Sequence, residues 1–264
     1  MNNRMKTGFF GGGKMAEGIL SAILTNGVVE NPLDILVGEK LPSRGEYLAA
    51  KYRVSVTTAI DVVAKSCDMI FLAVRPQDVD AVAAEVRPLL TKKHTIVSIV
   101  AGKTLDALRK TFGDEVRLVR VMPNLALRVG EGMCAVCGDG ADEVVKILSA
   151  AGQAVKLDEK DFDAVTALSG SGPAYFAYMA QAMADAGVRL GLSPETALLL
   201  SEQTMLGTAK FLRSSGAKLD EFIAGVCTKG GTTAAGMEKL APSDFRQIVT
   251  DTLAAAANRS KELA

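Results

Sequence analysis

Residues 7–19 have the sequence TGFFGGGKMAEGI, in which a short apolar run meets three consecutive glycines. Residues 14–26 then place apolar side chains at helical spacing, and Asn26-Gly27 is a stop signal. Gly11-Gly12-Gly13-Lys14-Met15-Ala16 fits G-x-G-x-x-A at this predicted strand-to-helix junction. Glycines there let the backbone approach a pyrophosphate, and the start of the helix supplies free N–H groups. A purely structural turn is the alternative, but this context favours a dinucleotide-binding loop.

Outward from this loop, short apolar runs alternate with helical periodicity as far as residue 157. Strands are predicted over 6–10, 33–37, 54–56, 69–74, 95–100, 116–121, 133–137 and 154–157. Helices are predicted over 14–26, 42–51, 59–67, 78–90, 104–112 and 141–151. Strands that are apolar throughout and separated by helices indicate a parallel sheet covered on both faces. We therefore predict an α/β domain of the Rossmann type, with a doubly wound parallel sheet.

Strand signals disappear after residue 157, and helical periodicity takes over. Helices are predicted over 161–168, 174–190, 194–212, 219–225, 232–240 and 243–263, with the S-G-S-G-P segment at 169–173 as an interruption. The sequence thus predicts two domains, a dinucleotide-binding domain at 1–157 and an all-helical domain at 158–264. Met179, Met183 and Leu190 lie at helical spacing and are expected in a core or a dimer interface rather than at a cofactor.

Composition excludes several classes of partner. Thirty basic residues balance thirty acidic ones, so no overall field attracts nucleic acid or an anionic membrane. No apolar run approaches the roughly 20 residues of a membrane helix. The N-terminal residues do not resemble a secretory signal, so we expect a cytoplasmic protein with reduced thiols.

Two sequence features could suggest other chemistry. Cys134 and Cys137 form C-x-x-C, but in a strand their side chains point to opposite faces, so we interpret them as structural and predict no metal site. His94 is the chain's single histidine and follows Lys92-Lys93, which predicts a solvated loop side chain. One histidine leaves no obvious Ser-His-Asp triad.

The second predicted strand is followed by Glu39 and Lys40. An acid at this position typically binds the diol of the adenine ribose, which favours NAD. Lys40 and Arg44 could offset the repulsion between Glu39 and a 2′-phosphate. The sequence therefore leaves both NADH and NADPH open as the cofactor.

Several segments, taken in order, resemble the pyrroline-5-carboxylate reductase family: TGFFGGGKMAEGI, MIFLAVRPQDV, VSIVAGKTL, VRVMPN with VGEGM after it, DAVTALSGSGPAYFAYMAQAMADAGVRLGL, and GGTTAAG. They cover nearly the whole chain, and LSGSGPAY with the later GGTT is far more specific than the glycine loop. The resemblance implies a Rossmann domain, an all-helical dimerisation domain and NAD(P)H-dependent reduction of 1-pyrroline-5-carboxylate to L-proline. It also implies a homodimer, with a decamer of five dimers as a further assembly.

Matching positions imply roles for individual residues. Residues matching the cofactor-binding segments are Gly11, Gly12, Gly13, Lys14, Met15, Ala73, Val74, Arg75, Pro76, Ala101, Gly102 and Asn124. Gly230, Gly231, Thr232 and Thr233 match the loop that holds the substrate carboxylate and ring nitrogen, which the family donates across the dimer.

Physical reasoning on these residues leaves alternatives. The glycines of the 230–233 loop leave N–H groups open for one carboxylate, and Thr233 could assist proton delivery to the ring nitrogen, which makes it the candidate catalytic residue. Both threonines could instead merely cap a helix. Ser171 could contact substrate, or the small residues around it could only allow close packing.

Some positions depart from the family pattern. Leu125-Ala126 replaces Thr-Pro, Thr228-Lys229 replaces Ser-Pro, Ala217 replaces Glu, and Ile60 stands where Asn is frequent. These departures keep open a diverged, non-catalytic dinucleotide-binding paralogue or a related imine reductase.

Overall fold

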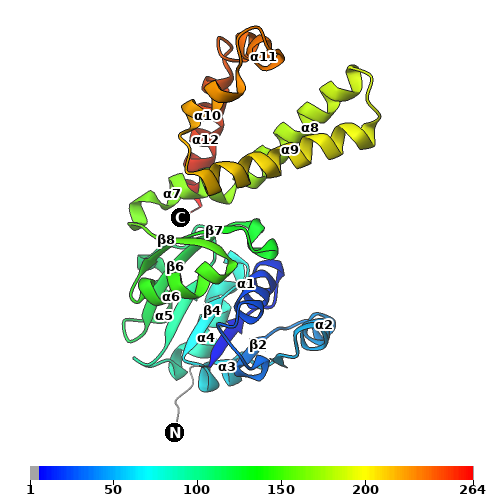
Figure 1. Cartoon of the computed structure of the whole chain (residues 1–264). Coiled ribbons are helices and arrows are strands. Elements are labelled where there is room, and N and C mark those ends of the chain that lie inside the picture. The colour runs from blue at the N-terminus through cyan, green and yellow to red at the C-terminus, as the bar shows by residue number, and fades with distance from the viewer. Residues whose placement is uncertain (1–5, 264) are drawn as a thin grey trace. The chain divides into compact units, whose positions relative to one another are not determined.

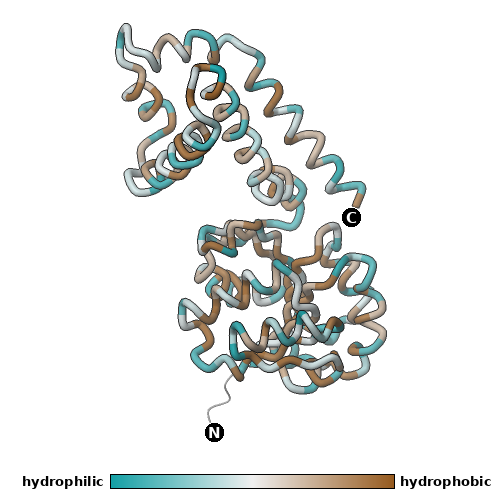
Figure 2. Tube along the Cα trace, turned by 90° about the vertical axis from the view of Figure 1, so that its right-hand side faces the viewer, coloured by the Kyte–Doolittle hydropathy of each residue, from teal (hydrophilic) through white to brown (hydrophobic). Residues whose placement is uncertain are grey.

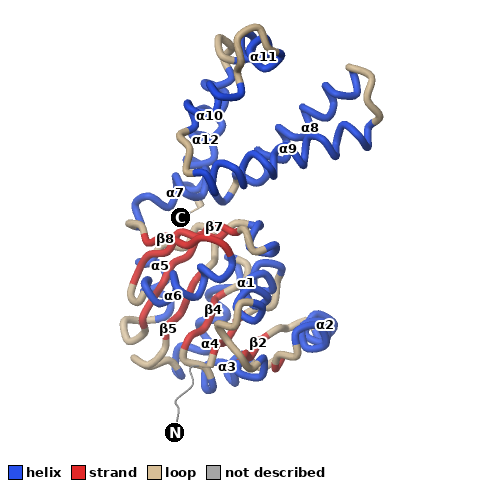
Figure 3. Tube along the Cα trace, viewed as in Figure 1, coloured by secondary structure: helices blue, strands red, loops and turns tan. Residues whose placement is uncertain are grey.

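The computed structural model describes residues 6–263, so residues 1–5 and 264, at the outer ends of the two predicted domains, lie outside it. Within that range the chain forms two compact units: residues 6–171 with 255–263, and residues 172–254. All strands lie in the first unit, whereas the second contains only helices and loops (Figure 3). The last strand ends at Lys156, close to the predicted end of the strands at residue 157. Residues 158–171, however, belong to the same compact unit as the sheet.

The first unit is built on an eight-stranded sheet with the order β3-β2-β1-β4-β5-β6-β7-β8 (Figure 1). The strands are β1 (Thr7–Phe10), β2 (Ile35–Gly38), β3 (Ser55–Thr57), β4 (Met69–Leu72), β5 (Thr95–Ser98), β6 (Arg117–Pro123), β7 (Gly132–Gly138) and β8 (Gly152–Lys156). The order reverses between β1 and β4, which pair in parallel from Thr7↔Met69 to Phe10↔Leu72. In doubly wound sheets, ligands bind at the carboxyl ends of the strands at this switch point.

The prediction of a wholly parallel sheet is wrong at one edge, because β7 runs antiparallel to β6. A parallel crossover needs a dozen or more residues, usually including an α-helix. Residues 124–131 between the two strands contain only a short 3-10 helix, Leu125–Val129, which the sequence did not predict. The rest of the sheet is parallel, including the β7–β8 pair, so the α/β prediction holds.

Helices cover both faces of the sheet, as strands with no polar face require. The α-helices that lie wholly in the first unit are α1 (Lys14–Thr25), α2 (Pro42–Tyr52), α3 (Ile60–Ser66), α4 (Val79–Val86), α5 (Leu105–Phe112), α6 (Ala141–Leu148) and α7 (Phe162–Val165). Adjacent residues of β1 point to opposite faces: Phe9 packs with residues of α1, α2 and α6, and Phe10 with residues of α3, α4 and α5. The Phe9 ring also stacks on Phe71 at 5.0 Å between centroids.

The predicted interruption at 169–173 is instead a wide helical turn. Thr166–Gly170 forms a π-helix that follows α7, and α8 (Gly172–Arg189) begins two residues later. The Thr166 carbonyl accepts the Ser171 N–H at 2.9 Å, which closes this turn. The glycines therefore widen the helix rather than end it.

The second unit contains all of α8, α9 (Pro194–Ser215), α10 (Leu219–Val226) and α11 (Thr232–Leu240), together with the first part of α12 (Phe245–Glu262). Small residues bring α8 and α9 close, because a Cβ on Gly187 would lie 3.2 Å from the Ala197 Cβ. The Ser201 hydroxyl donates to the Ala180 carbonyl at 2.7 Å across the same pair. Hydrophobic residues recur along these helices (Figure 2), and many of them are exposed in the single chain.

Candidate functional site

The glycine loop lies between β1 and α1, at the switch point of the sheet. Gly11 has φ of +94°, a left-handed conformation that a side chain would strain. A Cβ there would also lie 2.8 Å from the Ala73 carbonyl oxygen, which follows the neighbouring strand β4. Two residues from the predicted cofactor segments, Gly11 and Ala73, are therefore brought together.

The start of α1 is open. Gly13 is its N-cap with no side-chain cap, and a Cβ on Gly13 would meet no atom within 4 Å. The first N–H groups of a helix have no partner within it and carry the positive end of its dipole. Residues 14–16 thus present backbone donors to an anion, and Lys14 is exposed beside them.

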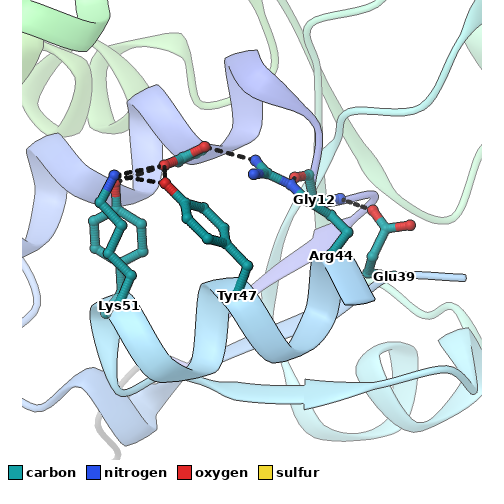
Figure 4. Close-up of polar contacts among 7 residues, drawn as sticks. Gly12, Glu39, Arg44, Tyr47 and Lys51 are labelled. Atoms are coloured by element: carbon teal, nitrogen blue, oxygen red, sulfur yellow. Dashed lines mark hydrogen bonds and ion pairs between the residues drawn. The ribbon is translucent and has the colours of Figure 1, made fainter. Parts of the chain in front are cut away.

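Glu39 directly follows β2 and faces the same loop (Figure 4). Its Oε2 accepts the Gly12 N–H at 2.8 Å and its Oε1 accepts the Leu41 N–H at 3.0 Å. The neighbouring Lys40 is exposed. The carboxylate is therefore fixed at the end of β2, where sequence reasoning placed a ribose-binding acid.

A buried carboxylate, Glu17, lies in the first turns of α1 and was missed by sequence reasoning. Its oxygens accept from Arg44 Nη2 at 2.7 Å, Lys51 Nζ at 3.0 Å, and the Tyr47 and Tyr52 hydroxyls at 2.9 Å each. Figure 4 shows Arg44, Tyr47 and Lys51 on α2. A signal was present: these three residues repeat at helical spacing toward one face of α2.

The four donors decide the ionisation of Glu17. Burial is the largest single influence and opposes the charged form, but the donors together outweigh it. They lower the pKa of Glu17 from 4.5 to about 2, with Arg44 the largest of them. Arg44 also donates through Nε to the Gly12 carbonyl at 2.7 Å, which links this cluster to the glycine loop.

The segment after β4 contains Ala73, Val74, Arg75 and Pro76. Pro76 begins a 3-10 helix, Pro76–Asp78. Arg75 is 75% exposed and pairs through Nε with Asp78 at 2.9 Å, so its guanidinium lies at the surface in the single chain.

A cavity of about 250 Å³ lies beside the loop after β5. Its lining residues, all in the first unit, are Ala101, Gly102, Thr166, Ser171, Ala256, Arg259, Ser260 and Leu263. Gly102 has φ of +74°, and a Cβ there would clash with the Leu263 carbonyl oxygen. The Ser260 hydroxyl donates to Asp163 at 2.7 Å and holds this end of α12. The structure thus brings Ala101, Gly102 and Ser171 together.

Asn124 immediately follows β6. Its Oδ1 accepts the Met133 N–H at 3.1 Å, so this side chain ties the end of β6 to β7. In the single chain, the side-chain oxygen of Asn124 is thus used in a structural hydrogen bond.

The 230–233 loop lies in the second unit, before α11. Gly230 has φ of +72°, and Gly231 is the N-cap of α11 with no side-chain cap. Thr232 and Thr233 are the first two helical residues and are exposed, so neither threonine caps the helix. The Gly231 N–H donates to the Thr228 carbonyl. The first N–H groups of α11 have no partner within the helix and are not capped by a side chain. This loop has the features expected of a carboxylate site.

Cysteine chemistry is not supported by the environment of the C-x-x-C pair. Cys134 and Cys137 pack into different hydrophobic clusters, which confirms that they point to opposite faces of β7. Burial raises the pKa of Cys134 to about 12 and that of Cys137 to about 11. It likewise raises the pKa of Cys67 to about 12, whereas Cys227 is half-buried. Between residues 6 and 263, no three His, Cys, Asp or Glu side chains are grouped as metal ligands.

The prediction of a solvated His94 is wrong. Its side chain is 1% exposed, with Nε2 at 2.9 Å from the Ala64 carbonyl oxygen and Nδ1 accepting the Thr91 N–H at 2.8 Å. The two lysines before it mark an exposed turn, but the turn folds the imidazole back under α3. His94 therefore holds the turn after residue 91 against α3 and is not part of the candidate cofactor or substrate site.

Comparisons with known proteins find similar proteins for both parts of the chain. A family model described as pyrroline-5-carboxylate reductase dimerisation matches residues 159–263, and one described as NADP oxidoreductase, coenzyme F420-dependent, matches residues 6–102. The chain is 38% identical to a pyrroline-5-carboxylate reductase of Arabidopsis thaliana, over 98% of this chain and 95% of that protein. None of the helices described is long and apolar enough to span a bilayer.

Solved structures agree. A pyrroline-5-carboxylate reductase from Coxiella burnetii is 30% identical, with a TM-score of 0.93 over 99% of both chains. The pyrroline carboxylate reductase of Plasmodium falciparum, solved with NADP bound, is 28% identical, with a TM-score of 0.84 over 98% of both chains.

Proposed function

The chain belongs to the pyrroline-5-carboxylate reductase family, and we propose that it catalyses NAD(P)H-dependent reduction of 1-pyrroline-5-carboxylate to L-proline. The observation that carries this proposal is the 38% identity to a reductase of this activity over 98% of the chain. A dinucleotide loop at the switch point and a carboxylate-binding loop at the start of α11 are the two parts that the reaction needs.

The residues of the first unit fit a nicotinamide dinucleotide. A Cβ on Gly11 would fill the space beside Ala73, and the open N–H groups of residues 14–16 suit a pyrophosphate. Glu39 lies where its carboxylate would accept hydrogen bonds from the hydroxyls of a ribose diol. We assign Gly11 to Met15, Glu39, Lys40 and the segment 73–76 to the cofactor's phosphate and adenosine parts.

The cofactor supplies the hydride, and the protein positions and orients the reactants. The cavity bounded by Ala101, Gly102 and Ser171 supports placing the nicotinamide end there. Asn124, which follows β6, is assigned to the cofactor from the family resemblance. A protonated cyclic imine is already electrophilic. Hydride transfer to this imine therefore does not need a catalytic triad.

The loop at Gly230, Gly231, Thr232 and Thr233 would hold the substrate. Open N–H groups at the start of α11 would bind its carboxylate, and the exposed Thr233 hydroxyl would hydrogen-bond the ring nitrogen and assist proton delivery. Neither threonine is used as a helix cap, which supports a role in binding.

Residues 159–263 match the family's dimerisation domain, which supports a homodimer. Residues 158–264 would then act as the dimerisation and substrate domain, and residues 1–157 as the dinucleotide domain, with a decamer of five dimers as the larger assembly. Four free cysteines fit a reducing, cytoplasmic location.

A turnover assay tests the activity. Purified protein is mixed with 1-pyrroline-5-carboxylate and NADH or NADPH, and cofactor absorbance is followed. We expect a decrease that depends on the imine and formation of proline. Tight cofactor binding without any turnover would instead identify a non-catalytic paralogue.

A further inference from the structure

The chain's choice between the two nicotinamide cofactors depends on the charges around the adenosine ribose, since NADPH differs from NADH only by a 2′-phosphate. Glu39 is the acid at that position, and both of its oxygens are fixed by backbone N–H groups of Gly12 and Leu41. The Oε2 atom would lie only 3.2 Å from a Cβ on Gly12, so this carboxylate is held against the loop. A 2′-phosphate arriving there would meet a fixed negative charge.

Arg44 is a nearby cation that could neutralise such a phosphate, but two of its three guanidinium nitrogens are engaged elsewhere. Nε donates to the Gly12 carbonyl at 2.7 Å and Nη2 to Glu17 at 2.7 Å. The guanidinium also lies 5.0 Å from the Tyr47 ring centroid, and the side chain is only 24% exposed. Figure 4 shows the Arg44 side chain extending away from α2, with its guanidinium joined to the carboxylate by a dashed line.

Glu17 keeps Arg44 in this position. Glu17 is 5% exposed, so removing Arg44 would leave a buried carboxylate short of its strongest donor. Lys51 is bound to the same carboxylate and to the Tyr47 hydroxyl at 2.7 Å, so it is not free either. Lys40 directly follows Glu39 and is exposed, so its ammonium group is not held against the position of the 2′-phosphate.

We propose that Glu39 and Glu17 together make this chain select NADH over NADPH: Glu39 repels the 2′-phosphate, and Glu17 withholds the arginine that would bind it. The proposal rests on the dinucleotide site of the proposed function. It would distinguish this chain from the Plasmodium falciparum relative that was solved with NADP bound.

Direct binding tests the selection without turnover. Isothermal titration calorimetry compares 5′-AMP with adenosine 2′,5′-bisphosphate, and nicotinamide fluorescence compares NADH with NADPH. We expect the Kd of NADH to be at least about tenfold lower than that of NADPH, with the fragments ranked in the same order. Equal affinities, or tighter NADPH, would overturn the proposal.

Variants separate the two carboxylates. Glu39→Ser should strengthen bisphosphate binding about tenfold and weaken AMP binding several-fold. Adding Glu17→Gln should free Arg44 and strengthen bisphosphate binding several-fold more, and adding Arg44→Met should abolish that second gain. The control Asp142→Asn removes an exposed pair with Lys156, on β8 at the opposite edge of the sheet, and should change neither ratio.

Loss of Glu17 could destabilise the fold, so one variant keeps it. In the Glu39→Ser background, Arg44→Met should leave bisphosphate affinity unchanged if Arg44 is withheld. A fall of several-fold would show that Arg44 already binds the phosphate and would overturn the role of Glu17. Imine turnover with equal affinity for both cofactors would overturn only the selection, whereas selective binding without turnover would contradict only the proposed activity.

Discussion

At the scale of single residues, the buried carboxylate of Glu17 links stability to pH. The folded pKa is about 2 and the ordinary value 4.5. Between these values the unfolded chain binds the proton more readily, so stability falls as pH falls through this window. The contribution is fully present above pH 4.5 and amounts to at most about 3 kcal/mol.

Glu17→Gln should therefore flatten the decline in stability at acidic pH. Urea unfolding at about pH 5 and about pH 3 measures it: the wild type should lose more of its free energy of unfolding between the two than the variant. Asp142→Asn serves as the control, because its carboxylate lies on the surface. Identical slopes for wild type and Glu17→Gln would show that the cluster does not hold the charge.

Thr233→Ala tests the hydroxyl assigned to the ring nitrogen. We expect kcat to fall about 10- to 100-fold, since a positioned proton-transfer group contributes on this order, while cofactor affinity stays the same. Steady-state kinetics and cofactor titration measure the two effects. Thr111→Ala on α5 is the matched control, and a wild-type rate for Thr233→Ala would remove the hydroxyl from the mechanism.

At this scale, the sequence predicted a residue's role best where the local backbone conformation allows only one residue type, such as glycine. The loop motif predicted a strand-to-helix turn at Gly11, and the structure has such a turn there, with a left-handed Gly11 close to Ala73. His94 was mispredicted because its neighbours in sequence are lysines, whereas its partners, Ala64 and the Thr91 turn, are set by tertiary packing. Glu17 was missed for the same reason, since its donors come from α2.

At the scale of elements, the start of α5 is fixed by a side-chain cap. The Thr104 hydroxyl accepts the Ala107 N–H at 3.2 Å, and α5 covers one face of the sheet through Leu108 and Phe112. Thr104→Ala should lower the free energy of unfolding by about 1 kcal/mol, and Thr104→Ser should restore most of it. Urea denaturation of the three proteins measures this; equal stability of Thr104→Ala and wild type would contradict the capping role.

Element boundaries followed from the sequence where caps and breakers are local. Helices α1 and α11 begin at the predicted residues, after Gly13 and Gly231. The reversal of β7 was not predicted, because apolar strands look alike whether they pair in parallel or antiparallel. The length of the preceding connection was the available signal.

At the scale of the whole molecule, exposed apolar side chains on α8 and α9 indicate a surface that binds a partner. Phe176 is 65% exposed, Tyr178 73% and Leu199 65% in the single chain. Large exposed apolar patches mark interaction sites, and the family's dimerisation domain spans these helices. A second copy of the chain is the partner that this match implies.

Leu199→Glu should disrupt that dimer, since a charge buried at an interface loses its hydration. We expect light scattering after size exclusion to show monomers. Imine reduction should be lost as well, because the family resemblance implies that the 230–233 loop is donated across the dimer. Lys146→Glu, at an exposed position of α6, is the control for a changed charge. A dimeric, active Leu199→Glu protein would contradict this account of the interface.

The different environments of the four thiols also have a practical consequence. Three are sealed in hydrophobic packing with raised pKa values, while Cys227 is half-buried and directly precedes Thr228. A maleimide dye should therefore attach selectively at Cys227, without any engineered cysteine. The native chain would then carry its own spectroscopic reporter, one residue from the turn that leads into α11.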